Sequence, residues 1–591
     1  MAFIQKVAPT PNKIMQFSLK DFSGGMNNRS DQIEDNEGAR VINLMFADDT
    51  LLETRYGQKY FDDKVIDGEV VFIDEFKPYD DDNVLIRASD KKIYFGDDEY
   101  PLKGIPSGTN FQGKYYYSDG EKLMVYGKFT QESDTYNKIV GTPVNEYMSF
   151  KVISPPEDYT PLDTEHTQGV TVIDYTNKTI HYEPCQNELE DTDTGDCVIP
   201  ESVKYVVSHN NRLYVSGNKK EDDSIYLSDE NRPFYFPYIL KLQVPPSSDN
   251  ITGLHVFDDS VVIGREWDIF VLTGKTNRTN QNRELFKIKK LNTHTGFASH
   301  RAVNIAHNYL IFLGSDGNVY GLQNTRTYER DLATVILSKT IDLKADPINL
   351  DKEDYKNAVS HFYNDEWYLN MKDITLVYSY RHMAWVMYKG LNARSCYGYD
   401  GEWIWGRPEG RIATFDKENF FDFGEPYQTL WYSKPFDMGT AHNYKQFREF
   451  FLVAHTFDLQ YSDVYVTFEI DYADVKERAV ISNQIARWGF AKWGDRFITR
   501  RINESLPFVI GRRGRTIRFK ITNNFDLDGV VDSYEELENY PAKREGLLVK
   551  LSSGGYYLYT KREWKLLKEE ELNQRMKIYQ INGDFEMRGN R

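Results

Sequence analysis

The sequence predicts a mainly β protein, with a β-propeller body, an additional C-terminal β-sheet domain and few helices. Short runs rich in Tyr, Val, Ile, Phe and Trp recur between Asp, Asn and Gly turns, whereas long stretches of helical period are rare. Aromatic residues make up 15% of the 591 residues, which excludes a disordered chain because so much apolar surface must be buried. A hairpin-like unit also repeats along the chain, as expected for a propeller.

Each copy of this unit is a polar turn followed by a run of large apolar residues that ends in Gly, or in Asn in one weaker copy. Successive copies start 48 and 49 residues apart in the middle of the chain, close to the about 40–50 residues of a four-stranded propeller blade. An array of β-sandwiches is the structural alternative, because the copies carry neither a WD nor a Kelch signature. The copies lie at residues 93–96, 123–127, 213–217, 261–264 and 310–314, with weaker ones at 367–370 and 403–406.

These patterns divide the chain into three parts. Residues 1–75 form an N-terminal connector stretch with the first strands, and residues 76–425 form the propeller-like body with an acidic insertion at about 154–200. Residues 426–591 form the C-terminal β domain, where alternating apolar residues indicate half-buried strands. A polar insertion at about 526–571 interrupts this domain, and the sequence predicts a helix within residues 562–576.

Composition excludes several classes of protein. The 90 acidic residues exceed the 72 basic ones by 18, which disfavours a surface that grips nucleic-acid phosphates. The three cysteines, Cys185, Cys197 and Cys396, are too few for a disulfide framework and fit synthesis in a reducing cytosol. No apolar run approaches the about 18 residues of a membrane span, so we expect no membrane insertion. The first 25 residues lack the apolar core of a secretory signal.

Motifs for chemistry are incomplete. Residues 108–114 have the glycine and lysine spacing of a phosphate loop, but Tyr115 stands where Ser or Thr must hold the metal. His181, Cys185 and Cys197 lack a fourth zinc ligand at a suitable spacing. With 90 acidic residues in the chain, some carboxylates must lie as close together as the catalytic pair of a glycosidase. Such a pair therefore does not identify a catalytic residue. We therefore expect no enzyme activity, no catalytic residue, no metal and no cofactor.

One cationic and aromatic cluster stands out in the C-terminal part. Trp488 and Trp493 lie beside Arg487, Lys492 and Arg496. Such a cluster suits the anchor of a protein interface. Cation–π packing inside the domain is the alternative.

The two ends carry more specific patterns. Near the start, Phe22-Ser-Gly24-Gly25-Met-Asn27-Asn-Arg29 is followed by an Asp-Asn-Glu motif at residues 35–37 and by Arg55-Tyr-Gly57. The chain ends in Tyr579-Gln-Ile-Asn-Gly583-Asp-Phe585, followed by Arg588-Gly-Asn-Arg591. Between them, Trp431-Tyr-Ser433 precedes Phe436-Asp-Met-Gly439. These motifs resemble those of bacteriophage tail proteins of the nozzle type, also called tail tubular or distal tail-tube proteins.

The resemblance implies a non-enzymatic virion structural protein of a phage tail, made in the host bacterial cytoplasm. Proteins of this family form a ring, usually of six copies, below the portal and adaptor, and fibres attach around it. Viral DNA passes through the ring without sequence-specific binding. An acidic lining would repel phosphates over a Debye length of about 8–10 Å, so DNA would slide.

Interface residues are expected at the two ends and in the Trp cluster. Two glycines next to one another allow positive φ or close backbone approach, although an ordinary turn would use them as well. Two other functions remain open: a receptor- or glycan-binding tail-tip protein, and a carbohydrate-active enzyme on a propeller. The interface candidates are Phe22, Gly24, Gly25, Arg29, Trp488, Trp493 and Arg588.

Overall fold

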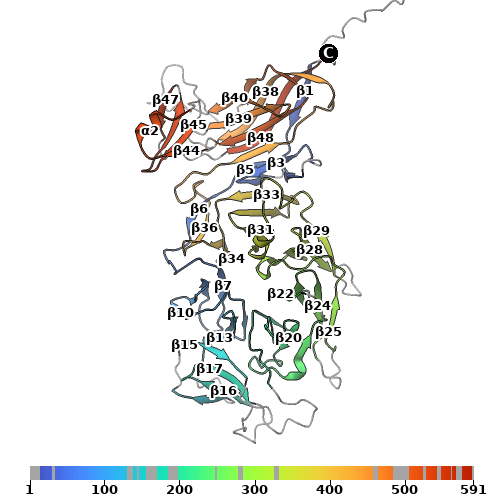
Figure 1. Ribbon diagram of the computed structural model, residues 1–591, viewed down its shortest axis with the longest axis vertical. Helices are drawn as coiled ribbons and strands as arrows, with labels where there is room; N and C mark the ends of the chain where they lie inside the picture. The colour runs from blue at the N-terminus through green and yellow to red at the C-terminus, as the bar shows by residue number, and fades with distance from the viewer. Residues whose placement is uncertain are drawn as a thin grey trace, which may run out of the picture.

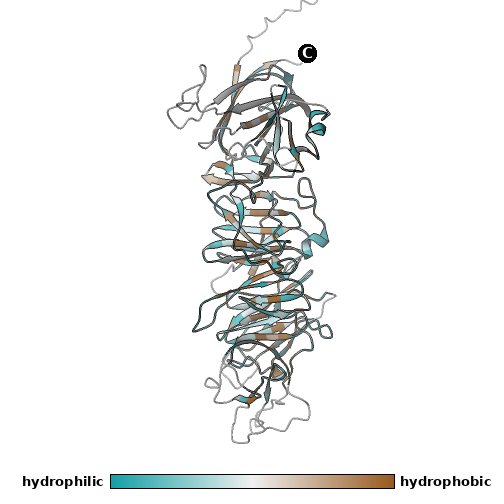
Figure 2. Ribbon diagram, turned by 90° about the vertical axis from the view of Figure 1, so that its left-hand side faces the viewer, coloured by the Kyte–Doolittle hydropathy of each residue, from teal (hydrophilic) through white to brown (hydrophobic). Residues whose placement is uncertain are grey.

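The computed structural model has an elongated shape, with a ring of small sheets at one end of the long axis and a two-sheet sandwich at the other (Figure 1). A view turned by 90° shows hydrophobic residues concentrated in the strands of both parts (Figure 2). The residues described are 14–29, 33–48, 50–129, 137–142, 146–154, 170–183, 197–245, 249–276, 284–324, 332–456, 463–482, 505–523, 527–541, 547–560, 562–567 and 576–588.

Seven antiparallel sheets form the ring within this described part of the chain. Each begins with an inner strand, and inner strands of neighbouring sheets contact one another around the ring, from β11 to β18 and β22 and from β26 to β30, β34 and β7. The first four sheets contain β7 (Phe72–Phe76), β8 (Val84–Ala88), β9 (Lys92–Phe95) and β10 (Asp98–Pro101); β11 (Gly108–Phe111), β12 (Lys114–Ser118), β13 (Leu123–Lys128) and β15 (Tyr147–Val152); β18 (Tyr205–His209), β19 (Arg212–Ser216), β20 (Ser224–Leu227) and β21 (Lys241–Gln243); and β22 (Ile251–Phe257), β23 (Ser260–Arg265), β24 (Ile269–Thr273) and β25 (Lys287–Lys290).

The remaining three sheets complete the circle. The fourth strand of the last sheet comes from the N-terminal part of the chain, where Tyr60 pairs with Ala413. This pairing closes the ring and removes two exposed sheet edges. The sheets contain β26 (Val303–Ala306), β27 (Tyr309–Leu313), β28 (Val319–Asn324) and β29 (Leu332–Ile336); β30 (Val359–Tyr363), β31 (Glu366–Met371), β32 (Ile374–Ser379) and β33 (Ala384–Lys389); and β34 (Ser395–Tyr399), β35 (Glu402–Gly406), β36 (Ile412–Asp416) and β6 (Gly57–Tyr60).

The protein is therefore mainly β with a β-propeller body, which confirms the predicted fold class. The predicted repeat marks the second strand of the third to seventh blades, whereas its first two copies lie on the third strands β9 and β13. Its polar turns adopt positive φ, as at Asn211 and Asp259. The second blade is extended by three further strands, β14 (Asn137–Val140), which precedes the acidic insertion, and β16 (Val170–Asp174) and β17 (Thr179–Glu183), which lie within it. Residues 155–169 and 184–196 of the insertion lie outside the described part.

The sandwich at the other end combines both ends of the chain. One sheet contains β1 (Ile14–Leu19), β4 (Leu44–Asp48), β5 (Leu51–Thr54), β38 (Tyr444–Thr456), β41 (Ser505–Val509), β42 (Arg513–Gly514) and β48 (Met576–Arg588). The other contains β2 (Gly25–Met26), β3 (Glu37–Ile42), β37 (Leu430–Ser433), β43 (Ile517–Asn523), β39 (Asp463–Ile470) and β40 (Ala473–Ser482), and it continues into the sixth blade through β33. Phenylalanines fill the space between the sheets, as where Phe450 and Phe519 lie 5.3 Å apart.

Residues 1–75 do not form a separate unit in their described part. β1, β4 and β5 belong to the sandwich, β2 and β3 to the sheet shared with the sixth blade, β6 to the last blade, and Phe72 already begins the first blade. The physical reason is that short isolated strands cannot satisfy their backbone groups. β1, β2, β3, β5 and β6 therefore pair with distant segments, and β4 pairs with the neighbouring β5.

The predicted helix within residues 562–576 is wrong where the structure describes it. Residues Glu563–Leu566 form strand β47, and Met576 begins β48. Trp564 contacts the ring of Tyr559 on the paired strand at 5.1 Å, and this cross-strand contact outweighs the helical period. The sheet containing β47 is completed by β44 (Leu527–Val531), β45 (Leu547–Leu551) and β46 (Tyr556–Thr560), beside α2 (Tyr534–Glu538).

Candidate functional site

The N-terminal motif lies at the junction of the sandwich and the propeller. Phe22 is fully buried and meets the ring of Trp431 edge-on at 5.2 Å. Gly25 has φ of +64°, and a Cβ atom there would lie 2.4 Å from the carbonyl oxygen of Trp385 in the sixth blade. A Cβ atom on Gly24 would lie 2.6 Å from Cγ of Glu37. The glycines therefore allow the backbone to pass between β33 and β3.

Polar groups of the same motif attach to the segment that joins the fifth and sixth blades. The Arg29 guanidinium donates a hydrogen bond to the carbonyl of Ile341 at 3.0 Å. The Asn28 side chain donates to the carbonyl of Asp342 at 2.8 Å and accepts from its backbone N–H at 2.7 Å. Phe22 and Gly25 are buried within the molecule and contact residues of the same chain, whereas Gly24 and Arg29 are half-buried.

The other predicted interface residues are placed only in part. Trp488 and Trp493 lie outside the described residues. Arg588 is the last residue of β48, opposite Tyr444 of β38, and its side chain is not among those described.

The Arg55-Tyr-Gly57 motif forms a buried ion pair that sequence reasoning did not single out. Arg55 is 1% exposed and contacts the Asp422 carboxylate through two hydrogen bonds of 2.9 and 2.6 Å. Its guanidinium stacks over the ring of Tyr427 at 3.9 Å. Burial acts to lower the pKa of Arg55, but the charge of Asp422 outweighs it and raises that pKa. The ion pair connects Arg55, just before β6, with Asp422 in the linker between the propeller and the sandwich.

The strand that precedes the N-terminal motif pairs with the strand that contains the C-terminal motif. β1 runs antiparallel to β48, with Phe17 opposite Gly583 and Leu19 opposite Ile581. β48 also pairs with β38 over most of its length and with β5 at Lys577 and Ile578. Motifs more than five hundred residues apart are thus parts of one structural unit.

A cavity of about 260 Å³ lies among the inner strands of the propeller, and we call it the axial cavity. The first, second, fifth, sixth and seventh blades contribute to its wall. Hydroxyl, imidazole and guanidinium groups lie beside apolar side chains there. The lining residues are Val71, Phe72, Ile73, Asp74, Pro106, Ser107, Gly108, His300, Arg301, Val303, Asn304, Val359, Ser360, His361, Ser395, Cys396 and Tyr397.

Burial controls the charge of this cavity. It raises the pKa of Asp74 to about 6, although the hydroxyl of Tyr115 donates a hydrogen bond of 2.5 Å to that carboxylate. It lowers the pKa values of His300 and His361 to about 4, so both imidazoles are neutral at pH 7. It raises the pKa of Cys396 to about 12, so this thiol is not a nucleophile. Asp74 is the only carboxylate in the lining, so the cavity does not contain the acid pair of a glycosidase.

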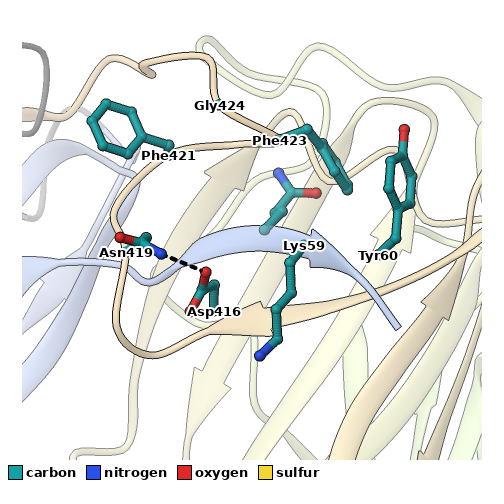
Figure 3. Close-up of a pocket in the computed structure, with 8 residues that line it drawn as sticks. Lys59, Tyr60, Asp416, Asn419, Phe421, Phe423 and Gly424 are labelled. Carbon is teal, nitrogen blue, oxygen red and sulfur yellow. Dashed lines mark hydrogen bonds between the residues drawn. The ribbon is translucent and has the colours of Figure 1, made fainter. Parts of the chain in front are cut away.

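A second depression, of about 490 Å³, opens beside the strand that closes the ring (Figure 3). Tyr60 and Phe423 lie in its wall with ring centroids 4.4 Å apart, and Tyr60 is 39% exposed. The Asn419 amide donates a hydrogen bond to Asp416 at 2.9 Å (Figure 3). Exposed aromatic faces next to amide and carboxylate groups are suited to stacking on a sugar ring.

Comparisons with known proteins add a likeness of shape only. No family model matches the chain, and no curated protein matches it. Among solved structures, the designed protein Ika8 is similar over 60% of this chain and 97% of its own, with 11% identity and a TM-score of 0.30. The Pan2 WD40 domain of Neurospora crassa is similar over 63% and 97%, with 8% identity and a TM-score of 0.31. These scores are too low to support an argument, and the propeller assignment depends on the strand pairing above.

No group of three or more His, Cys, Asp and Glu side chains is placed to hold a metal ion in the described part of the chain. His181 instead lies 2.9 Å from Glu183, and Cys185 is outside the described residues. Neither α1 (Lys352–Lys356) nor α2 nor any other described helix has the length and hydropathy needed to cross a membrane.

Proposed function

We propose that the protein is a non-enzymatic structural component of a phage tail, a nozzle or hub whose copies form a ring that conducts DNA. The observation that carries this proposal is the meeting of the two ends in one sandwich through β1 and β48. Gly583 and Phe585 of the C-terminal motif lie opposite β1, and Phe22 of the N-terminal motif packs against Trp431 of the middle motif, so these three motifs of the resemblance meet in the sandwich.

Two further properties support the proposal. The molecule is elongated, with the sandwich and propeller at opposite ends, so copies placed side by side around an axis would form a ring with two levels (Figure 1). The net charge of −18 would keep duplex DNA from adhering to such a ring. In this proposal the partners are other copies of the chain, the portal or adaptor, further tail proteins and fibres, and the protein resides in the virion.

The test is the assembly state of the purified full-length protein. Mass photometry and negative-stain microscopy over nanomolar to micromolar concentrations should show a closed ring, usually of six copies, with a channel of at least about 20 Å for duplex DNA. A fluorescent duplex should not be retained by the ring at physiological salt. A strict monomer at every concentration, which also fails to dock on tail particles emptied of DNA, would contradict the proposal.

Glycan binding is the second candidate, and the aromatic depression beside Tyr60 favours it. A screen against bacterial cell-wall polysaccharides should then give binding that Tyr60→Ala removes. Tyr238→Ala is the matched control, because Tyr238 is an exposed tyrosine (57%) on the third blade.

A further inference from the structure

The axial cavity contains a half-buried cation for which the described residues provide no carboxylate partner. Arg301 donates from one terminal nitrogen to the backbone carbonyl oxygens of Val71 at 3.0 Å and Arg394 at 3.3 Å. No described carboxylate lies within 4.0 Å of its guanidinium, although the chain has an excess of acids. Burial lowers its pKa to about 10, and only the Cys396 thiol opposes this. Arg301 still carries a full positive charge at pH 7.

A guanidinium that lacks a carboxylate partner can bind an anion from solution. Partial removal of its charge from water is unfavourable unless a partner compensates it. Both carbonyl contacts come from the same terminal nitrogen of Arg301. They connect the fifth blade to the first and seventh blades. The other two guanidinium nitrogens have no protein acceptor in the described structure, and they belong to a residue that lines the cavity.

A second unused donor lies close to Arg301 in the sequence and on the same wall. Asn304 accepts a hydrogen bond from the Ser360 hydroxyl at 2.6 Å through its side-chain oxygen. This contact fixes the amide so that its nitrogen is the free end, and no described acceptor contacts that nitrogen. Asn304 and Ser360 both line the axial cavity. Arg301 and Asn304 thus present N–H donors to the same space.

We propose that the axial cavity binds a small organic ligand with a single carboxylate, which accepts hydrogen bonds from Arg301 and Asn304. A planar carboxylate fits the paired N–H groups of a guanidinium. Arg301 is the one cation of the lining at pH 7, and a phosphate dianion would bring two negative charges into a cavity that already contains Asp74, whereas a carboxylate brings one. The volume of about 260 Å³ is below the range of about 300–1,000 Å³ common for drug-sized ligands, which limits the ligand to a small molecule.

The test measures thermal stability of the full chain against acetate and glucuronate at constant ionic strength, with acetamide as the neutral analogue of acetate and inorganic phosphate as the dianion. Both carboxylates should raise the melting temperature saturably, acetamide should have no effect, and phosphate should act less than acetate. Arg301→Gln should weaken carboxylate binding at least about tenfold. Arg411→Gln is the matched control, because Arg411 stacks over Tyr60 away from the cavity, and it should bind as the wild type does.

Two further measurements separate binding from a folding role of Arg301. Asn304→Asp keeps the shape and the acceptor for Ser360 but places a negative charge beside the site, so it should abolish acetate binding in a folded protein. A structure of the wild type soaked with cacodylate, a monoanion with two oxygens, should show arsenic in the axial cavity beside Arg301. Equal effects of acetate and acetamide, full affinity in Asn304→Asp, or arsenic only outside the cavity would each overturn the proposal.

Discussion

At the scale of single residues, buried ionisable groups determine how stability responds to pH. Asp74 has a pKa of 3.8 when unfolded and about 6 in the fold, mainly because it is buried. The folded protein holds this proton more tightly, so its stability decreases as pH rises from about 4 to about 6. His300 and His361 act in the opposite sense, because folded pKa values of about 4 cost stability as pH falls below 6.5.

Asp74→Asn should therefore be more stable than the wild type at pH 7 and lose this advantage at pH 4. The difference between the two pH values should be about 3 kcal/mol, at about 1.4 kcal/mol for each unit of pKa. The asparagine keeps an acceptor for Tyr115, and the histidine contributions cancel because both proteins contain them. Urea unfolding midpoints at pH 4, 5, 6 and 7 measure the effect.

Asp97→Asn is the control for this comparison. The hydrogen bond and charge of Lys64 lower the pKa of this exposed carboxyl, so its removal should give no gain of stability with rising pH. Parallel pH profiles of Asp74→Asn and the wild type would contradict the assignment of a raised pKa to Asp74.

The residues of the end motifs also show where sequence reasoning stops. The residues that Phe22 and Arg29 contact, Trp431 and Ile341, lie more than three hundred residues away in the sequence. The motif by itself does not distinguish a surface for another chain from a contact inside one chain. The same holds for Arg55, whose partner Asp422 follows the last blade.

At the scale of elements, strand β2 is the part of the junction between sandwich and propeller that leaves the least space for a side chain. Its two residues lie between β33 and β3, where Gly25 faces Trp385 and Glu37. The positive φ of Gly25 disfavours any side chain, and the carbonyl of Trp385 leaves no room for a Cβ atom.

Gly25→Ala should destabilise the protein by about 3 kcal/mol or more, since backbone strain adds to overpacking. Gly401→Ala is matched to it, with φ of +75° but nothing within 4 Å of the added Cβ atom, so only about 1 kcal/mol of backbone strain is expected. Chemical unfolding of both variants measures the difference. Equal losses of unfolding free energy in the two variants would show that the protein accommodates the added Cβ atom beside Trp385 without a further penalty.

Strands were easier to predict than the helix for a local reason. A turn followed by a run of apolar residues is a short-range signal, and it located the second strand of five blades and the third strand of the first two. In residues 562–567 the charged and apolar residues fit a helix as well as a strand, and pairing with β46 decided for the strand.

At the scale of the whole molecule, one hydrophobic core spans the sandwich and three blades. It includes Ile311 of the fifth blade, Trp367 of the sixth and Trp405 of the seventh together with Trp431 and Phe447 of the sandwich. The small sheet β44–β47 has a separate core of Val531, Leu537, Val549 and Leu551. Among the described contacts, Lys550 and Tyr556 connect it to Glu425.

Hydrogen exchange under increasing denaturant should therefore show β38 and β31 opening together, because they share one core. β45 should open at lower denaturant, because its own core is small. Peptides that cover β38, β31 and β45 report the three regions by mass spectrometry in a single experiment. Independent opening of the sandwich while the sixth blade stays protected would contradict a shared core.

The sequence by itself determined the β class, the blade-sized repeat and the special residues at both ends, because turns and alternation depend on neighbouring residues. Only the tertiary structure decided that β6 closes the ring, that β1 and β48 join in one sheet, and that Arg301 faces a cavity without a carboxylate partner in the described chain. Each of these depends on which distant strands pair. That choice is made by burial and backbone hydrogen bonding over the whole chain.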